Sequence, residues 1–317
     1  MTLSTKMASE KKVTSAYIFL AIGILAVSMA AIFVRLAQQE GVPSLLIAAG
    51  RLGIATLILT PLTLRSADYR AQIYQLSRLD RVLVVVSGFF LALHFATWVT
   101  SLEYTSVLIS VVLVTTSPIW VALLEVFVLR ARMTRLVVIG LVVALMGGLL
   151  IGSTGANAQV DSDNTLLGGA LSLIGAITVA VYLIIGRRLR PHLSLAPYIW
   201  MVYGSAALIL TAAILFTGTQ ITGYSTAAYL LLLAVALFPQ LIGHTSFNYA
   251  LAYLPATVVS VTTQAEPIGS AIIAIIVFSE IPGIGQILGS AVLLFGVLLA
   301  SLGQKQSPSE IIETVEA

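Results

Sequence analysis

Long apolar segments follow one another along most of the chain, and they constrain the fold more than any other feature. Each is about 17 to 24 residues long, so a helix rising about 1.5 Å per residue would cover roughly 25–35 Å, the thickness of a bilayer core. The expected segments are residues 15–36, 44–64, 82–100, 106–129, 136–152, 166–185, 195–216, 228–250, 256–278 and 285–302. We therefore expect an all-α polytopic membrane protein with ten transmembrane helices.

The composition supports the same class. Hydrophobic residues make up 59% of the 317 residues and charged residues only 9%, with a mean hydropathy of +1.04. No soluble domain of this length needs so much apolar surface, so the expected surroundings are a lipid bilayer. The net charge of +3 does not indicate nucleic-acid binding, because the basic residues lie in short loops. The chain has no cysteine, which excludes disulfides and thiolate metal sites; we expect no metal and no cofactor.

The positive charges indicate the orientation of the bundle. Lysine and arginine cluster before the first segment and after the second, fourth, sixth and tenth, which are all on one side of a ten-span protein. The loops on the other side contain neither residue, and Asp161 and Asp163 lie there. We expect a multi-pass protein of the cell (inner or plasma) membrane with both termini in the cytoplasm. Residues 1–14 would be a cytoplasmic N-terminal segment and residues 303–317 a cytoplasmic tail.

The chain contains an internal repeat, with halves at residues 15–153 and 166–302. At an offset of about 149 residues, the matched pairs are Tyr104 with Tyr253, Pro118 with Pro267, Gly140 with Gly289 and Gly147 with Gly296. Five spans per half is an odd number, so the second half must enter the membrane from the opposite side. Many secondary transporters use such inverted repeats and bind substrate near the midplane between them.

Polar side chains within the spans are the candidate site residues, because a polar group at membrane depth needs a partner, water or a proton. Glu266 precedes Pro267 in the middle of the ninth span, and the proline leaves a backbone carbonyl without its usual donor. The residues expected to line a cavity are His94, Trp98, Ser117, Gln240, His244, Asn248, Gln264 and Glu266. Of these, Glu266, His94 and His244 are the candidates for proton coupling.

Each candidate also has a structural alternative. Gln240, His244 and Asn248 form one stripe on the eighth span and could instead hold neighbouring helices together. His94 could be a packed neutral histidine, and the Ser117 hydroxyl could bond to its own helix. Glu266 could pair permanently with a cation or cap a freed backbone group.

Three charged residues within the spans are expected to be mainly structural. Arg51 lies about 10 Å into the membrane and needs an anionic or carbonyl partner, so we expect it to pair with helix ends. Arg35 and Glu125 lie close to span ends. The glycines of the fifth and tenth spans permit close helix packing, either as scaffold or as the seam of a homodimer.

These features together resemble the EamA group of the drug/metabolite transporter superfamily, over about residues 15–302. The resemblance rests on the two five-span repeats, Arg51 in the second span, a small residue three before each of Tyr104 and Tyr253, and Glu266-Pro267 followed by Phe278-Ser279-Glu280. It implies a ten-helix basket whose central cavity is lined mainly by spans 1, 3, 4, 6, 8 and 9. One position departs from the pattern: Ala131 replaces the acidic residue expected after the fourth span, so any role of that carboxylate falls to Glu280 alone.

The sequence therefore favours a secondary transporter that moves a small organic solute by alternating access, in the export direction, with proton coupling or exchange. The solute would be a metabolite, an amino acid or a drug-like compound. The alternatives are an intramembrane enzyme using His94, His244 and Glu266, or a passive solute channel. Against the enzyme, the chain has no His-Glu-x-x-His and no Gly-x-Ser-x-Gly motif. Against the channel, it has no ring of charges and no filter-like carbonyl motif.

Overall fold

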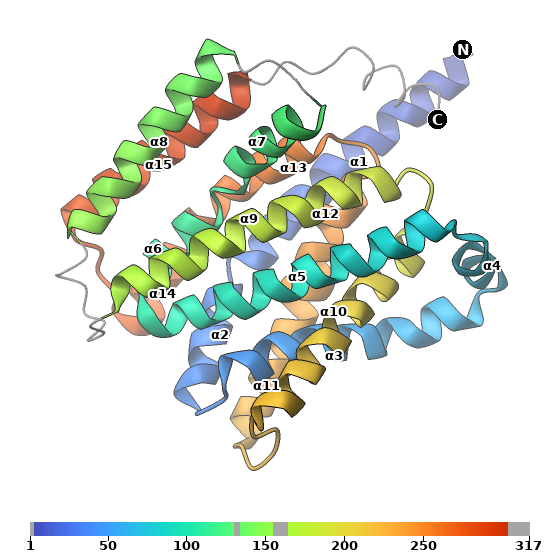
Figure 1. Cartoon of the computed structure of the whole chain (residues 1–317), viewed down its shortest axis with the longest axis horizontal. Helices are drawn as coiled ribbons and strands as arrows, with labels where there is room; N and C mark the ends of the chain where they lie inside the picture. Colours follow the sequence, from blue (N-terminus) through green and yellow to red (C-terminus); the bar gives the residue numbers. More distant parts are fainter. Residues whose placement is uncertain (1–2, 130–133, 155–163, 304–317) are drawn as a thin grey trace.

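The computed structural model describes residues 3–129, 134–154 and 164–303, and all regular elements in these ranges are helices (Figure 1). The first half contains α1 (Leu3–Val27), α2 (Ala30–Gln39), α3 (Ser44–Arg65), α4 (Ala67–Gln75), α5 (Arg78–Tyr104), α6 (Val107–Val114), α7 (Ser117–Leu129) and α8 (Arg135–Thr154). The second half contains α9 (Thr165–Leu189), α10 (Leu195–Thr217), α11 (Thr226–Val235), η2 (Ala236–His244), α12 (Thr245–Ala250), α13 (Ala256–Thr262), η3 (Thr263–Ala265), α14 (Glu266–Phe278) and α15 (Ile284–Gly303).

The described part of the chain has eight helical segments that are long and apolar enough to cross a membrane. They are Lys12–Gln39, Ser44–Arg65, Arg78–Tyr104, Val107–Leu124, Thr165–Leu189, Leu195–Thr217, Thr226–Ala250 and Ala256–Phe278. Two shorter apolar helices, Arg135–Ile151 and Ile284–Ala300, coincide with the expected fifth and tenth spans. An all-helical polytopic membrane protein is thus confirmed, and a count of ten transmembrane spans stays a prediction.

Four of the expected spans are interrupted helices. The ninth span is interrupted next to Pro267, where a carbonyl was expected to lose its usual donor: α13 ends at Thr262, η3 adds a single 3₁₀ turn, and α14 begins at Glu266. The first half repeats the pattern, with α6 ending at Val114 and α7 beginning at Ser117. In each case the proline is the second residue of the new helix, where its missing N–H costs no helical hydrogen bond.

The other two interruptions have different causes. The eighth span changes to a π-helix over η2, which contains Pro239. The first span changes direction at Ser28 and Met29, between α1 and α2, without any proline. The sequence carries no local signal for this break.

Side chains of one interrupted span donate hydrogen bonds to backbone carbonyls of another. The carbonyl oxygen of Thr115, between α6 and α7, accepts a hydrogen bond from Gln264 Nε2 in η3 at 3.3 Å. The carbonyl oxygen of Ser28 accepts one from Ser270 Oγ in α14 at 3.0 Å. Each bond satisfies a carbonyl at a break in the first half with a side chain from the second half. In a bilayer, where no water replaces a missing donor, such bonds make interrupted helices tolerable.

Helices of one half pack against helices of the other: the counterparts α3 and α10 lie side by side, as do α8 and α15, while α5 lies along α9 and α1 along η2 and α12. The α8–α15 pair lies at one edge of the bundle in Figure 1. A Cβ at Gly140 or Gly147 of α8 would fall less than 3.0 Å from backbone atoms of α15, and a Cβ at Gly296 would fall equally close to the backbone of α8. A Cβ at Gly289 would meet the Ile151 side chain at 2.8 Å and the Ile151 backbone nitrogen at 3.0 Å. These four glycines therefore act as scaffold inside the chain; a homodimer stays a prediction.

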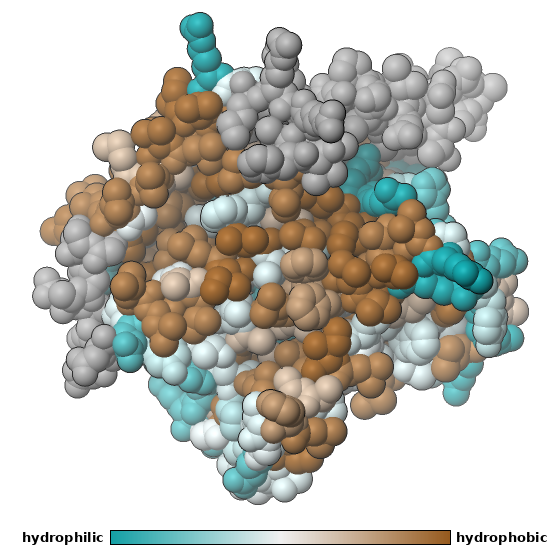
Figure 2. Space-filling view, viewed as in Figure 1, coloured by the Kyte–Doolittle hydropathy of each residue, from teal (hydrophilic) through white to brown (hydrophobic). Residues whose placement is uncertain are grey.

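The surface of the bundle is largely apolar. Figure 2 shows brown apolar side chains across most of one face, while teal polar ones gather towards its margins, at the end that holds α4 and along the lower left of the view. On α8 the exposed side chains include Leu145, Met146 and Leu149, each more than 60% exposed. A stripe of this kind suits contact with lipid and would be unfavourable in water.

The neighbouring glycines 147 and 148 provide a matched test of the α8–α15 contact. We expect Gly147→Ala to destabilise the protein by roughly 1–3 kcal/mol, because its methyl group would overlap the backbone nitrogen of Leu293. Gly148→Ala should be neutral or slightly stabilising, because its methyl group would meet only a side-chain atom at 3.8 Å while helix propensity improves. Melting temperatures of the purified variants in detergent measure both effects. Equal melting temperatures would show that α8 and α15 do not pack at this distance.

Candidate functional site

A cavity of about 50 Å³ lies where the interrupted helices meet. It is bounded by segments of six expected spans, the first, third, fourth, sixth, eighth and ninth, as the family resemblance implied. Its lining residues are Val27, Ala30, His94, Trp98, Val114, Thr115, Ser117, Val179, Leu183, His244, Phe247, Val259, Thr263 and Glu266. Both halves of the chain therefore contribute to one cavity, which has room for a small polar group rather than for a whole solute.

Five of the eight expected cavity residues line this cavity: His94, Trp98, Ser117, His244 and Glu266. Glu266 is the first residue of α14 and is 9% exposed. At that position its carboxylate is favoured by the partial positive charge of the helix N-terminus. Within the described residues it has no ion-pair partner. A carboxylate in this setting can bind a proton or a cationic group.

The two histidines lie close to each other and to the aromatic rings of the cavity. The ring centroids of His94 and His244 are 6.2 Å apart, and the His94 ring is parallel to that of Trp98 at 6.2 Å. His94 Nδ1 lies 2.9 Å from the carbonyl oxygen of Gly175. Because a carbonyl only accepts, Nδ1 must carry the proton of this hydrogen bond, which leaves Nε2 of the neutral ring as an acceptor.

The remaining three expected residues connect helices instead of lining the cavity. Gln240 Oε1 accepts a hydrogen bond from Arg51 Nε in α3. Asn248 Oδ1 accepts one from the Tyr182 hydroxyl at 2.6 Å, and Asn248 Nδ2 donates to the Tyr203 hydroxyl at 3.2 Å. Gln264 Nε2 donates to the carbonyl oxygen of Thr115, as described above. The stripe on the eighth span thus splits: His244 lies on the cavity, while Gln240 and Asn248 bond to α3, α9 and α10.

The expected pairing of Arg51 with helix ends is wrong. Arg51 is fully buried, and its guanidinium carbon lies 3.7 Å from the ring centroid of Phe95 and 5.9 Å from that of Trp98. Its one hydrogen bond among the described residues is from Nε to Gln240, at 3.0 Å; Nη1 and Nη2 have no partner. Aromatic faces attract a guanidinium through their π-electrons, so Phe95 offsets part of the cost of burying this charge.

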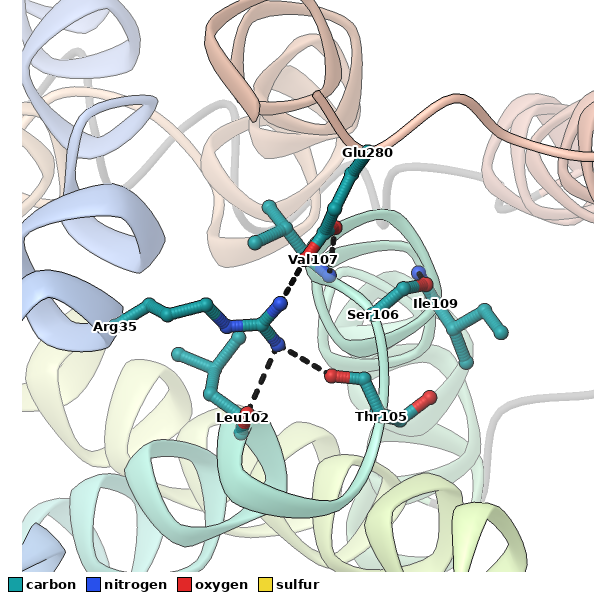
Figure 3. A network of polar contacts seen from close by, with 7 residues as sticks. All are labelled: Arg35, Leu102, Thr105, Ser106, Val107, Ile109 and Glu280. Atoms are coloured by element: carbon teal, nitrogen blue, oxygen red, sulfur yellow. Dashed lines mark hydrogen bonds and ion pairs between the residues drawn. The ribbon is translucent and has the colours of Figure 1, made fainter. Parts of the chain in front are cut away.

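A second polar cluster, the Arg35 clamp, lies farther along the same helices (Figure 3). Arg35 of α2 forms an ion pair with Glu280, which follows α14. Its Nη2 also donates to the carbonyl oxygens of Leu102 and Thr105, at the end of α5. The other carboxylate oxygen of Glu280 accepts from the backbone N–H of Val107, at the start of α6 (3.0 Å). One guanidinium and one carboxylate therefore join α2, α5, α6 and α14.

The Arg35 clamp forms part of the wall of a larger cavity of about 710 Å³. Arg35 and Leu102 face this larger cavity, whereas Ala30 and Trp98, about one turn back on the same helices, line the small one. The clamp therefore lies between the two cavities along α2 and α5. Glu125, the other expected structural charge, has its side chain outside the described residues.

Basic residues also hold the opposite end of the bundle. Arg187 Nη1 donates to the carbonyl oxygen of Leu251 at 3.1 Å, and Arg190 Nε donates to that of Asn248 at 2.8 Å. Leu251 is the repeat counterpart of Leu102, so in each half an arginine donates to the carbonyl at the equivalent position. The counterpart of Glu280 is Ala131, which lies outside the described residues. Burial lowers the pKa of the Arg190 guanidinium from its ordinary value, and the nearby Tyr198 phenol opposes this effect.

Some site residues gave no sequence signal. Val27 and Ala30 reach the cavity because of the break between α1 and α2, and nothing in the sequence marks that break. Phe95 and Phe247 are ordinary apolar residues in apolar spans, so their place beside Arg51 and His244 depends on tertiary packing. The sequence marked Arg35 and Glu280 individually as charged residues near span ends. It did not predict that they pair, because 245 residues separate them.

Comparison with known proteins identifies the family. The sequence model of the EamA-like transporter family matches residues 14–153 and 166–302. The chain belongs to this family. It is 23% identical over 259 residues to the uncharacterized transporter YyaM of Bacillus subtilis, covering 80% of this chain and 83% of the relative. It is 24% identical over 207 residues to the uncharacterized transporter YetK of the same bacterium, covering 64% of this chain and 62% of the relative, less than two thirds of its length.

Two further similarities concern an archaeal relative and a solved structure. An uncharacterized transporter of Archaeoglobus fulgidus is 25% identical over 209 residues, covering 65% of this chain and 71% of the relative. A solved structure titled "Crystal structure of protein" is similar with a TM-score of 0.64 at 16% identity, over 91% of this chain and 97% of that one. The latter similarity concerns the fold alone.

The Arg35 clamp can be tested by measuring access to the small cavity. Because the natural chain has no cysteine, Ser117→Cys introduces a single thiol on the cavity wall. In this background, we expect Glu280→Gln to raise the rate of modification by a water-soluble maleimide about tenfold, because a charge-assisted bond is typically worth about 1.5–3 kcal/mol.

Glu40→Gln is the matched control. Its carboxylate bonds to Ser225 on the exposed surface near the same end of the bundle, away from the clamp. This variant should leave the modification rate unchanged. Equal rates in the Glu280→Gln and unsubstituted backgrounds would show that the ion pair does not restrict access.

Proposed function

We propose that this EamA-family protein is a secondary active transporter that moves a small organic solute across the cytoplasmic membrane by alternating access. The observation that carries the proposal is the small cavity between the two halves, with His94, His244 and Glu266 on its wall. Titratable groups enclosed by segments from both repeats are what a transporter needs if solute and protons bind near the midplane.

In the proposed topology, ten spans form two inverted halves with both termini in the cytoplasm. The Arg35 clamp then lies at the external end, and Arg187 and Arg190 at the cytoplasmic end. The Arg35 clamp restrains the α5–α6 corner of the first half, and the Arg187 and Arg190 contacts, here called the Arg187 clamp, restrain the α12–α13 corner of the second half. Loosening one clamp while the other holds would open the cavity to one side only. The interruptions of α6–α7 and α13–α14 provide the hinges for this movement.

Glu266 is the proposed coupling residue, with His94 or His244 as its relay partner. The carboxylate can bind a proton when the cavity is open to one side and release it when the cavity is open to the other. Its position one residue before Pro267 at the start of α14 links the proton to the hinge, because bending there moves the carboxylate relative to the first half. Export of the solute would then be driven by proton entry.

The proposed topology is tested with reporter fusions. We expect reporters fused after Gly152 and Thr217 to be external, and those after Arg78 and Arg188 to be cytoplasmic, because basic loops stay in the cytoplasm. The paired use of alkaline phosphatase and a fluorescent protein reports both sides. An external signal at Arg188 would contradict both the orientation and the inversion of the halves.

The coupling role is tested by Glu266→Gln, which keeps the size and hydrogen bonding of the side chain but removes its titration. Uptake and efflux screens of a deletion strain against a metabolite panel first identify a solute. In proteoliposomes we expect this variant to lose pH-gradient-driven accumulation of that solute, by at least tenfold, and to retain solute exchange.

Glu266→Asp, which still titrates, is the control and should keep part of the gradient-driven accumulation. Full gradient-driven accumulation by a well-folded Glu266→Gln protein would exclude the coupling role. In that case, solute exchange measured in the same vesicles would still support the transport function.

A further inference from the structure

The buried surroundings of Arg51 contain a group of hydrogen-bond donors without acceptors. Arg51 Nη1 and Nη2 and Trp98 Nε1 are buried and have no hydrogen-bond partner in the described structure. Gln240 Nε2 is also buried; the Tyr203 hydroxyl lies near it but forms no hydrogen bond of normal geometry with it. These four nitrogens belong to three side chains that lie together: Arg51 Nε is bonded to Gln240, and its guanidinium carbon is 5.9 Å from the Trp98 ring. Buried donors of this kind are destabilising unless something accepts from them.

No anion of the described residues is bonded directly to the Arg51 guanidinium. Within the described residues, Arg51 forms no ion pair, although it lies in the core of a membrane-spanning helix. The Phe95 ring covers one face of the guanidinium, but hydrogen bonds to Nη1 and Nη2 form in its plane. The Glu266 carboxylate lies close enough to interact electrostatically with Arg51. It forms neither a hydrogen bond nor an ion pair with the guanidinium, so Nη1 and Nη2 lack a directly bound anion with two acceptor atoms in their plane.

A carboxylate has this shape and charge. Its two oxygens match the planar donors of an arginine, which is the strongest and most specific arrangement for binding such a group. Trp98 connects the donors to the cavity, because its ring lines the cavity while its Nε1 has no partner. The other cavity walls include the rings of His94, His244 and Phe247, which suit an apolar or aromatic remainder.

We infer that Arg51, Gln240 and Trp98 form the subsite that binds the carboxylate of the transported solute, so that the substrate class is a small organic monocarboxylate with an apolar or aromatic remainder. This inference rests on the proposed transport function. Of the three residues only Trp98 lies on the wall of the cavity of about 50 Å³, and Arg51 and Gln240 lie behind it. The carboxylate would therefore enter from this cavity past Trp98, and the remainder of the solute would occupy space that opens when the Arg35 clamp loosens. Because the subsite contains one cationic side chain, Arg51, it favours a solute with one carboxylate over a solute with two. The Glu266 carboxylate on the same cavity can receive an ammonium group, so α-amino acids belong to the accepted class.

Binding to the purified full-length protein in detergent tests this inference without any transport assay. The probes are pairs that differ only in the carboxylate: 3-phenylpropionate with 3-phenylpropionamide, L-phenylalanine with L-phenylalaninamide, and L-leucine with L-leucinamide. Inorganic phosphate and sulfate test for a general anion site. We expect saturable stabilisation against thermal unfolding by at least one of the three carboxylates and none by its amide, phosphate or sulfate.

Two variants test the assigned donors. Trp98→Phe keeps an aromatic ring and removes one N–H, and should raise the Kd of the stabilising carboxylate about tenfold. Trp120→Phe is its matched control, because the Trp120 indole already donates to Thr116 at 3.2 Å; this variant should bind like the natural protein. Arg51→Met should abolish carboxylate binding while the unliganded protein melts within a few degrees of the natural one, because an unpaired buried charge has been removed.

The opposite results overturn the inference. They are the absence of saturable stabilisation by all three carboxylates, equal stabilisation by an amide, or unchanged carboxylate affinity in Trp98→Phe. A large fall in the melting temperature of Arg51→Met with carboxylate binding retained would assign Arg51 a structural role. If Arg51→Met does not fold, the Trp98→Phe and Trp120→Phe pair decides. Transport of a neutral or cationic solute, unaffected by Trp98→Phe, would reject the carboxylate subsite and leave the transport function in place.

Discussion

A backbone carbonyl without a donor cannot face hydrocarbon, and much of this structure depends on how that constraint is met. The bundle contains helices that stop and restart within the membrane, and each restart frees carbonyl groups that a continuous helix would satisfy. Gln264 and Ser270 of the second half donate to the carbonyls of Thr115 and Ser28 in the first half. The two halves are therefore held together by the polar groups that their own interruptions expose. Apolar packing alone would give no such specificity, because lipid chains are as apolar as the helix surfaces.

The cavity follows from the same interruptions. Where a helix restarts, its first turn presents polar groups and leaves space that a regular helix would fill. Glu266 and Ser117 occupy equivalent positions at the two restarts and line the same cavity. The histidines and Trp98 approach from α5 and η2, and Arg51 lies behind Phe95 and Trp98. The position of each polar group thus depends on backbone irregularities contributed by both repeats, while the regular pair α8–α15 takes no part in lining it.

The class of fold was predictable because length and hydrophobicity act locally along the chain. The repeat and the interruption at Pro267 were predictable for the same reason, since proline acts on its own helix. The pairing of Arg35 with Glu280 was not, because it joins residues distant in sequence. Nor were the break at Ser28, which no local residue type marks, and the switch to a π-helix at 236–244, since Pro239 alone does not specify it. The helical stripe of Gln240, His244 and Asn248 assumed regular geometry, and the structure divides it among different neighbours. Arg51 was expected at helix ends, but aromatic rings and an amide surround it instead, which periodicity could not reveal.

The interruptions also affect how easily the molecule can change shape. A continuous helix resists bending because several consecutive hydrogen bonds would have to lengthen together. At residues 115–116 and 263–265 the regular α-helical ladder gives way to shorter i→i−3 bonds, such as Thr116 N–H to the Leu113 carbonyl and Glu266 N–H to the Thr263 carbonyl. Each span can therefore pivot as two rigid rods through changes in a few dihedral angles. The elastic work of such a pivot is small, and the free-energy difference between conformations is then set by side-chain contacts at the two ends. Substitutions at the clamps should therefore alter the populations of the conformations, whereas lengthening a hydrogen-bonded turn across either interruption should slow their interconversion.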